Sequence, residues 1–490
     1  MTGVVPKDAA AVILLRQNTD PRNPEVYWVR RSEKLAFLGG YHAFPGGQID
    51  PGDAEVDVRN APDAATATMI SGAARELFEE LGVLATRGGD TLTKGQRASL
   101  LDDLESGRMA WTALLKHYEL YLDANDFTFV GRWVTPPFNA RRFDTWFFLV
   151  NCPAKQEPYL TAGELDAGEW ITASEAYQRW MRDQVVAVPP TLHALRTLAN
   201  GVDANLVDRF LTLGHAHGEI ARRITFRPNY ICFPVRTPTR PPATHTCCYL
   251  IHTPEEMLIV DPGSPYEDEQ QALAECVDEM IAEGRRVRSI IITHLHPDHI
   301  GGVNALKAHL GGNVPIAAHA DTAAALTEIH VDELIAGGDV ITLAGEPQVK
   351  LKALHTPGHA RGHLCFHDEE RGALLTGDNI VGVGSVLIDP PEGNMRDYLN
   401  SLERMRALPN LSVLFGGHGP AVATPYRKID EYISHRLERE QSILQAVREG
   451  ATDPKQIVAK VYTDVSPKAY AMAERAVLAH LEKLREDGAI

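Results

Sequence analysis

The stretch "THLHPDHIGG" (residues 293–302) places four side chains of the metal-binding type within six positions, His294, His296, Asp298 and His299. The apolar run "RSIIITH" (288–294) precedes them and predicts a buried strand that ends where the polar residues begin. Histidines two positions apart at a strand end can point the same way, because side chains alternate along a strand. A folded core has no need of four such residues here, so the pattern indicates a metal centre.

Three further candidates follow in order along the chain. "HTPGHARGH" (355–363) supplies His359, "LLTGDNI" (374–380) supplies Asp378, and "FGGHGP" (415–420) supplies His418. Each lies at the end of an apolar run beside glycine, where the backbone can approach a metal closely. Ligands rich in histidine favour Zn²⁺, and the residue types alone leave Fe and Mn open.

This ordered set resembles the metallo-β-lactamase superfamily, whose fold is an αββα sandwich. The resemblance implies that His294, His296 and His359 hold one Zn²⁺, that Asp298, His299 and His418 hold a second, and that Asp378 bridges the two. It also implies a hydrolysis in which the metals activate water, with Asp298 as a candidate catalytic residue. Asp261 in "IVDPG" (259–263) matches an acid of the family that braces the ligand loop without binding the metal. His363 is a candidate for the same supporting role or for contact with substrate. His319 and His355 match no ligand position and are expected to be structural.

The tail of the chain narrows the resemblance. "HRLEREQSILQAVREGATDPKQIVAKVY" (435–462) and "AERAVLAHLEKLREDGAI" (473–490) resemble a winged helix, with strands only weakly indicated. With "RPPATHTCCYLI" (240–251), they resemble the beta-lactamase-like protein 2 type, which includes endoribonucleases. A winged helix can bind nucleic acid, but the mixed charges of this tail favour a structural or dimer-forming role. A true β-lactamase is not expected, since we find no export signal and no cysteine in the second metal position.

The first half of the chain holds a second acidic cluster, in "GAARELFEELGVL" (72–84). If this stretch is helical, Leu77, Leu81 and Leu84 form one apolar stripe and Gly82 ends the helix. Three acids then share another face: Glu76, Glu79 and Glu80. Like charges at this spacing repel by about 0.2–0.5 kcal/mol per pair, which a solvated helix tolerates, so the helix alone leaves both a metal site and an ordinary surface open.

The upstream turn "FPGGQIDPGD" (44–53) favours the metal site, because the two halves together resemble the Nudix hydrolase motif. Gly47 and Asp53 keep the spacing of its first part, with Asp53 where the family has Glu, and Arg75 opens its second part. The departure is a 21-residue stretch, residues 54–74, where the family has a much shorter spacer. A surface loop of this length costs little, but it puts the role of Asp53 in doubt.

The matches extend over roughly residues 8–200 and resemble the nudix-motif-19 type of acyl-CoA diphosphatase. The resemblance implies that Glu76, Glu79 and Glu80 hold Mg²⁺ or Mn²⁺, with Glu79 or Glu80 also serving as catalytic base. Arg75 would orient this cluster. Such ions keep several waters and bridge to phosphate oxygens, which fits cleavage of a diphosphate.

Composition limits the class of protein. The net charge of −17 argues against broad binding to nucleic acid, and no run of 18 apolar residues predicts a membrane span. The N-terminus reads as a first strand rather than a signal peptide. The six scattered cysteines fit free, mostly buried thiols in a reducing compartment, so a cytoplasmic protein is expected.

The expected architecture is multidomain, α+β and α/β. It has a Nudix α/β/α domain (1–200), a helical connector (201–228), a metallo-β-lactamase domain (229–426) and a winged-helix-like tail (427–490). The expected function is a bifunctional hydrolase. The first half would cleave a nucleoside-diphosphate-linked substrate of CoA type, and the second a thioester, an ester or an RNA phosphodiester. The alternative is a Nudix module that senses a ligand without turnover and regulates one active hydrolase. Oligomeric state is left open, with a dimer among the options.

Overall fold

The computed structural model describes residues 4–16, 18, 20, 22–161, 163–463 and 465–490. The chain forms two compact units, Met1–Pro228 and Asn229–Ile490. Each unit is described by itself below. No helix of the described residues is long and apolar enough to cross a membrane.

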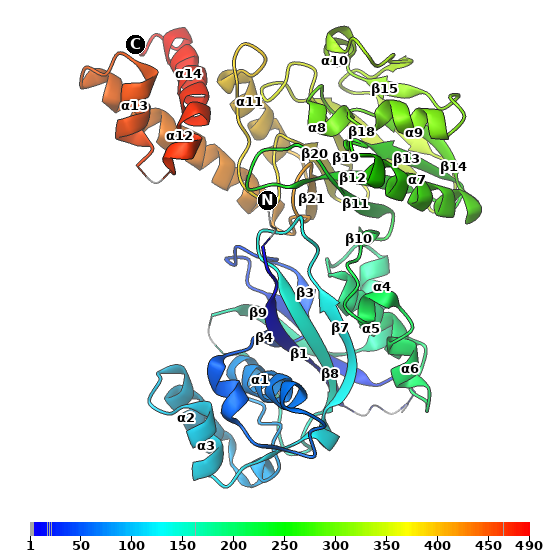
Figure 1. Ribbon diagram of the computed structural model, residues 1–490, viewed down its shortest axis with the longest axis vertical. Helices are drawn as coiled ribbons and strands as arrows, with labels where there is room; N and C mark the ends of the chain where they lie inside the picture. The colour runs from blue at the N-terminus through cyan, green and yellow to red at the C-terminus, as the bar shows by residue number, and fades with distance from the viewer. Residues whose placement is uncertain (1–3, 17, 19, 21, 162, 464) are drawn as a thin grey trace. The chain divides into compact units, whose positions relative to one another are not determined.

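A mixed sheet forms the centre of the first unit (Figure 1). Its order is β3-β2-β1-β8-β7, with β4 also paired to β1 and β9 to β2. β1 runs parallel to β8 and antiparallel to β2. The apolar runs "AAVILL" (10–15), "EVYWVR" (25–30) and "TWFFLV" (145–150) all lie in its strands. The strands are β1 Lys7–Arg16, β2 Glu25–Arg31, β3 His42–Ala43, β4 Gly46–Gln48, β7 Thr128–Val134, β8 Phe143–Asn151 and β9 Leu165–Thr172; a separate pair is β5 Val58–Arg59 and β6 Leu122–Asp123.

Helices cover both faces of this sheet, because the buried strand β1 is apolar on both sides. Ala10, Val12 and Leu14 pack in one core with α1, and Ala11 and Ile13 pack in a second core with α4 and α5. The helices are α1 Ala64–Leu81, α2 Lys94–Glu105, α3 Trp111–His117, α4 Ala173–Met181, α5 Pro189–Ala199 and α6 Leu206–Phe210, with short 3-10 turns at Pro51–Glu55, Gly89–Thr91, Ala124–Asp126 and Gly214–Ala216.

Helix α1 is the predicted glutamate helix, with defined caps at both ends. The Asp63 side chain accepts a hydrogen bond from the Thr66 amide at its start. Gly82 ends it with a φ of 61°, in the left-handed region that glycine adopts freely. Leu77 and Leu81 are fully buried, so the apolar stripe faces the sheet as expected.

Two expectations for this half of the chain need correction. The 21-residue stretch 54–74 is not all surface loop, because residues 64–74 form the first turns of α1 and only residues 54–63, which include β5, precede the helix. Residues 201–228 are not a mostly helical connector. They contain the short helix α6, one 3-10 turn and the strand β10 Ile224–Arg227. The side chains of "ITFR" (224–227) alternate between apolar and polar as in a strand, and Gly214 and Gly218 interrupt the helical pattern before it.

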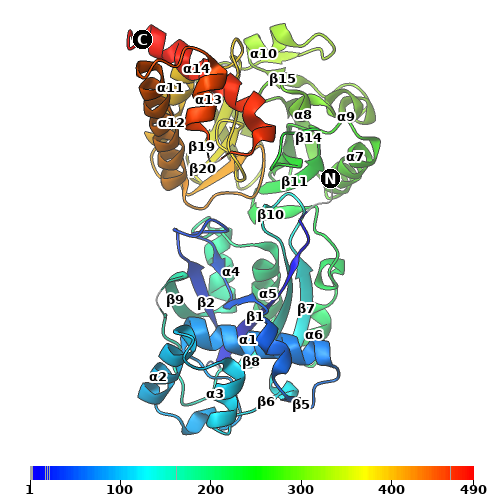
Figure 2. The same cartoon turned by 60° about the vertical axis from the view of Figure 1, so that its left-hand side comes forward.

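The second unit is a sandwich of two sheets with helices outside each (Figure 2). One sheet runs β11-β12-β13-β14-β15-β16 and the other β17-β18-β19-β20-β21. The strands are β11 Tyr230–Arg236, β12 His245–His252, β13 Glu256–Val260, β14 Arg286–Ile291, β15 Ile316–Ala318, β16 Glu333–Leu334, β17 Val340–Leu343, β18 Val349–His355, β19 Leu364–Asp368, β20 Ala373–Gly377 and β21 Val413–Gly416. This αββα arrangement is the one expected from the sequence.

Helices α7 and α9 bury their apolar faces on the first sheet, and α11 and α12 pack on the second. α13 and α14 complete a small helical tail with its own core, which includes Ile443, Ile457 and Val477. In the described part of this tail no strand is present, so the weakly indicated strands of a winged helix are wrong. The helices are α7 Glu267–Ala282, α8 Pro297–Ile300, α9 Val303–His309, α10 Ala320–Ala325, α11 Met395–Arg406, α12 Pro425–Arg448, α13 Pro454–Val461 and α14 Tyr470–Glu486.

Candidate metal centre

The seven predicted ligands of the second unit come from loops at the ends of its strands. The loop after β14 carries His294 and His296, and the short helix α8 carries Asp298 and His299. His359 follows β18, Asp378 follows β20, and His418 follows β21. Strands of both sheets therefore deliver their polar ends to one place, which is how residues 124 positions apart come to face one another.

The first group joins His294, His296, His359 and Asp378, whose potential ligand atoms all lie within 4.8 Å of one another. His296 Nδ1 lies 3.0 Å from both His294 Nε2 and His359 Nε2. Nitrogens that share one tetrahedral zinc ion at the usual 2.0–2.1 Å lie about 3.3 Å apart. The three ring nitrogens are therefore close to the spacing that a zinc ion requires.

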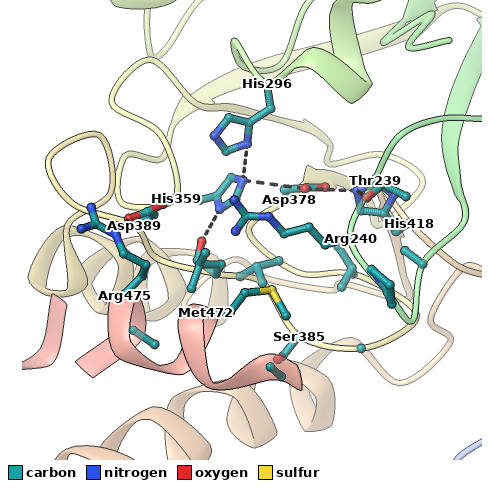
Figure 3. Close-up of a pocket in the computed structure, with 18 of the residues that line it drawn as sticks. Thr239, Arg240, His296, His359, Asp378, Ser385, Asp389, His418, Met472 and Arg475 are labelled. Atoms are coloured by element: carbon teal, nitrogen blue, oxygen red, sulfur yellow. Dashed lines mark hydrogen bonds and ion pairs between the residues drawn. The ribbon is translucent and has the colours of Figure 1, made fainter. Parts of the chain in front are cut away.

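The second group joins Asp298, His299 and His418 within the same limit. His418 Nε2 lies 3.5 Å from Asp298 Oδ2 and 3.2 Å from Asp378 Oδ2. His299 Nε2 lies 3.3 Å from Asp378 Oδ1, and His359 Nε2 lies 3.7 Å from Asp378 Oδ2. Asp378 thus lies between histidines of both groups, as a bridging carboxylate would (Figure 3).

Hydrogen bonds behind the rings fix which nitrogen faces the centre. His359 Nδ1 donates to the Leu387 carbonyl at 2.9 Å, and His418 Nδ1 to the His245 carbonyl at 2.8 Å. His299 Nδ1 donates to Asp261 Oδ2 at 2.8 Å. Because a carbonyl or carboxylate oxygen can only accept, the Nδ1 atoms of these three rings carry a proton, so Nε2 is the nitrogen that offers a lone pair when the ring is neutral.

His294 follows the same logic through a threonine. Thr293 Oγ1 donates to Asp261 Oδ2 at 2.6 Å, so its lone pairs are free to accept from His294 Nδ1 at 3.0 Å. His294 Nε2 then also presents a lone pair. Four imidazoles are held in the tautomer that binds a cation.

Two buried polar atoms at the centre have no hydrogen-bond partner among the described residues, His299 Nε2 and Asp378 Oδ1. Buried polar groups are almost always satisfied, and leaving one unpaired costs about 1–3 kcal/mol. A divalent cation between them would satisfy both atoms. The donor set of nitrogens and carboxylate oxygens therefore fits two transition-metal ions such as zinc.

The electrostatics of the cluster are those of a site that holds cations. Burial and the neighbouring His299 and His296 lower the pKa of His294 well below its ordinary value. Burial raises the pKa of Asp378, but His418 and His299 lower it more, and the net pKa lies well below the usual range. Burial lowers the pKa of His299 and of His418, but Asp378 and their other hydrogen-bond partners together raise both more, so that the pKa of His299 lies well above its ordinary value and the pKa of His418 is about 9. Neutral imidazole and ionised carboxylate are the forms that bind metal, so a cation in the second group would take the place of these protons.

Glycine allows this crowding. A Cβ atom on Gly417 would lie 2.3 Å from Asp378 Oδ1 and 2.7 Å from His299 Cε1. Such contacts do not occur in folded proteins, so only glycine leaves room for the two side chains here.

Asp261 braces the ligand loop through three contacts. Its Oδ1 accepts from the Thr293 amide at 2.8 Å, and its Oδ2 accepts from Thr293 Oγ1 and His299 Nδ1. Thr293 and His245 were missed in the sequence. The signal for Thr293 was its place directly before His294, whereas His245 contributes only a backbone carbonyl, which no side-chain pattern reveals.

His363 is fully buried and does not line the cleft. Its Nδ1 pairs with Thr356 Oγ1 at 3.0 Å, and its Nε2 accepts from the Asp378 amide at 3.1 Å. The expectation that it could contact substrate is therefore wrong, because Asp378 lies between it and the cleft; it positions Asp378 instead.

A cleft of about 910 Å³ opens at the metal-ligand cluster. His296, Asp298, His359, Asp378 and His418 line it from one side. The loops 238–243 and 381–392 and helices α12 and α14 supply the remaining walls (Figure 3). The helical tail thus contributes directly to the space above the cluster.

In the first unit, Arg75 joins the acids of α1 to the turn before it. Its Nη1 donates to Glu76 Oε1 at 2.9 Å and Glu79 Oε2 at 2.7 Å, and its Nη2 donates to the Gln48 carbonyl at 2.9 Å. Its Nε and Nη2 reach both oxygens of Asp53, at 3.1 and 2.9 Å. Asp53 is buried and also accepts from Ser71, so it anchors Arg75 despite the insertion.

The acids of α1 differ in environment. Burial and the nearby Glu76 raise the pKa of Glu80 to about 8, and the Gly46 amide donates to Glu80 Oε2 at 2.9 Å. Burial raises the pKa of Glu76 to about 7, although Arg75 opposes this. A Cβ atom on Gly47 would lie 2.4 Å from Glu76 Oε2, so this glycine admits the carboxylate.

Among the described residues, four groups of three or more possible metal ligands have their ligand atoms within 4.8 Å of one another, and none of these groups contains the glutamates of α1. One group lies away from the seven ligands, His319, Asp321 and His355. The rings of His319 and His355 stack 4.0 Å apart at 10°, and His355 Nε2 donates to the Arg361 carbonyl. Parallel stacked rings do not point their nitrogens at a common ion, which agrees with the structural role expected for both.

Comparisons with known proteins agree with this geometry. Residues 242–418 match the Metallo-beta-lactamase superfamily, and residues 454–490 match the Beta-lactamase associated winged helix domain. A Beta-lactamase-like protein 2 homolog from Caenorhabditis elegans is 30% identical over 251 residues, which are 50% of this chain and 80% of the relative.

Two further known proteins are similar to parts of the chain. An Atrochrysone carboxyl ACP thioesterase from Aspergillus chevalieri is 30% identical over 259 residues, 48% of this chain and 75% of the relative. The crystal structure of a NUDIX hydrolase from Alicyclobacillus acidocaldarius is 32% identical, covers 41% of this chain and 96% of that one, and has a TM-score of 0.36.

The fold, the ligand cluster and the relatives lead to one conclusion. The chain belongs to the metallo-beta-lactamase superfamily and is a hydrolase of that fold, with the winged-helix tail that accompanies it.

Proposed function

We propose that the second unit is a dinuclear zinc hydrolase of a small acyl thioester or ester. The observation that carries the proposal is the convergence of seven ligand side chains at a cleft, with His299 Nε2 and Asp378 Oδ1 left without hydrogen bonds. His294, His296 and His359 would hold one ion. Asp298, His299 and His418 would hold the other, with Asp378 between them.

When bound, two such ions would supply Lewis acidity, which acidifies water toward a pKa of about 7 and stabilises negative charge on a carbonyl oxygen. The chain's own residues supply position and proton transfer. Burial raises the pKa of Asp298, but His299 and His418 lower it by more, so that the net pKa lies below its ordinary value. This carboxylate therefore stays ionised at the cleft wall. It can therefore orient the attacking water and accept its proton.

The walls of the cleft favour a substrate with an apolar part. Val383, Val386, Leu387, Met472 and Ala473 are among the residues that line the cleft. An acyl chain against these residues would exclude water and hold the carbonyl near Asp298. The thioesterase name of the Aspergillus chevalieri relative supports this substrate class.

An assay with acyl thioesters of N-acetylcysteamine tests the proposal. We expect hydrolysis that is lost with a chelator, is restored by Zn²⁺, and is absent in His296→Ala. Single-stranded RNA is the comparison substrate. Cleavage of RNA without thioester hydrolysis would overturn the thioester proposal in favour of phosphodiester chemistry, and loss of neither activity in His296→Ala would refute the metal mechanism.

We propose a second activity for the first unit, which is Mg²⁺- or Mn²⁺-dependent cleavage of a diphosphate. The supporting observation is the Arg75 network, which holds Asp53, Glu76 and Glu79 together beside the buried Glu80. Carboxylates whose pKa values are raised by burial gain from a divalent cation that neutralises them. Glu76, Glu79 and Glu80 would hold the ion, and Glu79, the most exposed of the three, or Glu80 would act as base.

A diphosphate panel that includes CoA, with Mg²⁺ or Mn²⁺, tests this activity in wild type and Glu79→Gln. We expect turnover in the wild type and a loss of about 10²–10⁴-fold in the variant, the usual range for removal of a general base. Tight binding of a panel member without turnover would replace the diphosphatase with the ligand-sensing module.

A further inference from the structure

One arginine in the wall of the cleft has no partner. Arg240 lies in the loop between β11 and β12, is exposed, and lines the cleft. Among the described residues its side chain makes no hydrogen bond or ion pair. Figure 3 shows this side chain reaching from its loop toward His359 and Asp378.

The other arginines of the cleft are committed to the protein. Arg475 pairs with Asp389 and with the Pro390 carbonyl. Arg436 donates to the Val386 carbonyl, and Arg439 donates to the Val461 carbonyl at 2.7 Å. In the described part of the cleft, Arg240 is therefore the arginine whose five donors remain available to a bound molecule.

The loop that carries Arg240 is held at its base. Thr237 Oγ1 lies 2.9 Å from Thr246 Oγ1, and the Thr237 amide donates to the Thr244 carbonyl at 3.4 Å. Thr239 Oγ1 lies 3.4 Å from His418 Nε2, so the loop also touches the ligand cluster.

Proline stiffens the tip of the same loop. Pro241 and Pro242 follow Arg240 directly, and each fixes its own φ angle. A Cβ atom on Gly384 would lie 3.0 Å from Pro242 Cδ, so the loop also rests on the opposite wall. The Arg240 side chain thus starts from a defined position, which lowers the entropy lost when it binds a ligand.

We propose that Arg240 forms an oxyanion-binding subsite, which selects substrates that carry a carboxylate or phosphate in addition to the scissile bond. A guanidinium matches the two oxygens of such a group with a pair of charge-assisted hydrogen bonds. The inference rests on the proposed thioesterase and deepens it, because it names the chemistry of the preferred substrate: an acyl thioester with an apolar part and a second, anionic part.

The oxyanion can come from either end of a thioester. It can be a carboxylate at the end of the acyl group, or the phosphate of a phosphopantetheine carrier arm. Both present oxygen pairs to Arg240, and they differ in their distance from the thioester sulfur.

Binding of non-hydrolysable thioethers by the full-length chain in zinc-containing buffer tests the subsite without relying on turnover. One pair is S-(3-carboxypropyl)- and S-butyl-N-acetylcysteamine, which differ in the acyl-side carboxylate. The other pair is S-butyl-4′-phosphopantetheine and S-butyl-pantetheine, which differ in the carrier phosphate. Calorimetry gives each Kd.

In wild type we expect the anionic member of at least one pair to bind about 10- to 100-fold more tightly, the range for a charged hydrogen-bonded contact. The pair that shows the preference identifies the source of the oxyanion. In Arg240→Gln this preference should fall to near one, and in Arg240→Lys it should be partly kept. Arg288→Gln is the matched control, since Arg288 is also exposed but lies on β14 and outside the cleft.

Three results would overturn the subsite: no preference in either pair, no binding of any of the four compounds, or a preference that survives in Arg240→Gln. The last result would assign anion binding to the metals alone. Failure of the proposed function is a separate result. If no thioester is hydrolysed while the Arg240-dependent preference is present, the reaction is wrong and the subsite stands.

Discussion

Replacing Asp261 by asparagine tests the hydrogen bonds by which this side chain braces the ligand loop, and leaves the backbone conformation of residue 261 unchanged. Asp261 has a φ of 54°, in the left-handed region, which asparagine tolerates as well as aspartate does. The substitution keeps the size of the side chain and removes its charge. It therefore changes the hydrogen bonds to Thr293 and His299 with little change in backbone strain.

The expected magnitude follows from the three donors that face this carboxylate at 2.6–2.8 Å. An amide has one acceptor oxygen, so its NH₂ group must face at least one donor. In the less damaging orientation the Thr293 amide loses its partner, which costs about 1–3 kcal/mol of stability. His299 also loses its charged partner, and such losses behind a metal ligand reduce metal affinity about 10–100-fold.

Competition with a chromophoric chelator measures zinc affinity, and thermal unfolding in the presence of excess chelator measures stability. Asp368→Asn is the matched control, because Asp368 is also fully buried and accepts from Tyr230 and Arg371. Both variants should lose stability, but only Asp261→Asn should lose zinc affinity. Unchanged zinc affinity in Asp261→Asn, or an equal loss in both variants, would refute the reasoning.

Three other predictions concern the first unit. Burial, followed by the charge of Arg30, lowers the pKa of His42 from 6.5 to about 4. As the pH falls from about 6.5 to 4, His42 is protonated in the unfolded chain before it is protonated in the folded chain, so the free energy of unfolding should fall over that range. Measured by urea denaturation, the free energy of unfolding of His42→Phe should fall by about 3 kcal/mol less than that of wild type over this pH range. Equal losses in the two proteins would contradict the lowered pKa of His42. In Gly47→Ala the added Cβ displaces the Glu76 carboxylate, which is the flexible end of that side chain. The free energy of unfolding should therefore change by less than about 1 kcal/mol, while the affinity for Mg²⁺ or Mn²⁺ falls at least tenfold. Gly52→Ala is the control, because nothing lies within 4 Å of its added atom, and equal cation titrations for the two variants would contradict the prediction. Arg75→Lys cannot span Asp53, Glu76 and Glu79 at once and should lower the unfolding free energy by about 3–5 kcal/mol, so a change under 1 kcal/mol would argue against the network.

The strands and the metal ligands could be predicted because their signals are local. The run before His294 and the spacing of His296, Asp298 and His299 lie within one short stretch, and their chemistry has no use in a core. The end of α1 at Gly82 could be predicted for the same reason, since one residue decides it.

Long-range partners could not be predicted. Arg75 reaches Asp53 across the insertion only because residues 64–74 continue the helix and bring Ser71 beside the same carboxylate. The burial of His363 depends on Thr356 and Asp378, which reach it through different strands. The carbonyls of Leu387 and His245, which set the tautomers of His359 and His418, leave no trace in residue type.

The connector shows a different failure. Residues 201–228 contain enough helix-forming residues to favour a helix locally, yet β10 forms within them, because "ITFR" buries its apolar side chains as an extended strand. Local propensity is a weak guide where tertiary packing decides.

Zinc content measured by mass spectrometry on the purified full-length chain tests the central claim most directly. The account predicts about two zinc ions per chain in wild type, about one in His418→Ala, and fewer in a variant that also lacks His296. A wild-type chain that retains no transition metal after incubation with Zn²⁺ and gel filtration would contradict it, as would a zinc content that both substitutions leave unchanged.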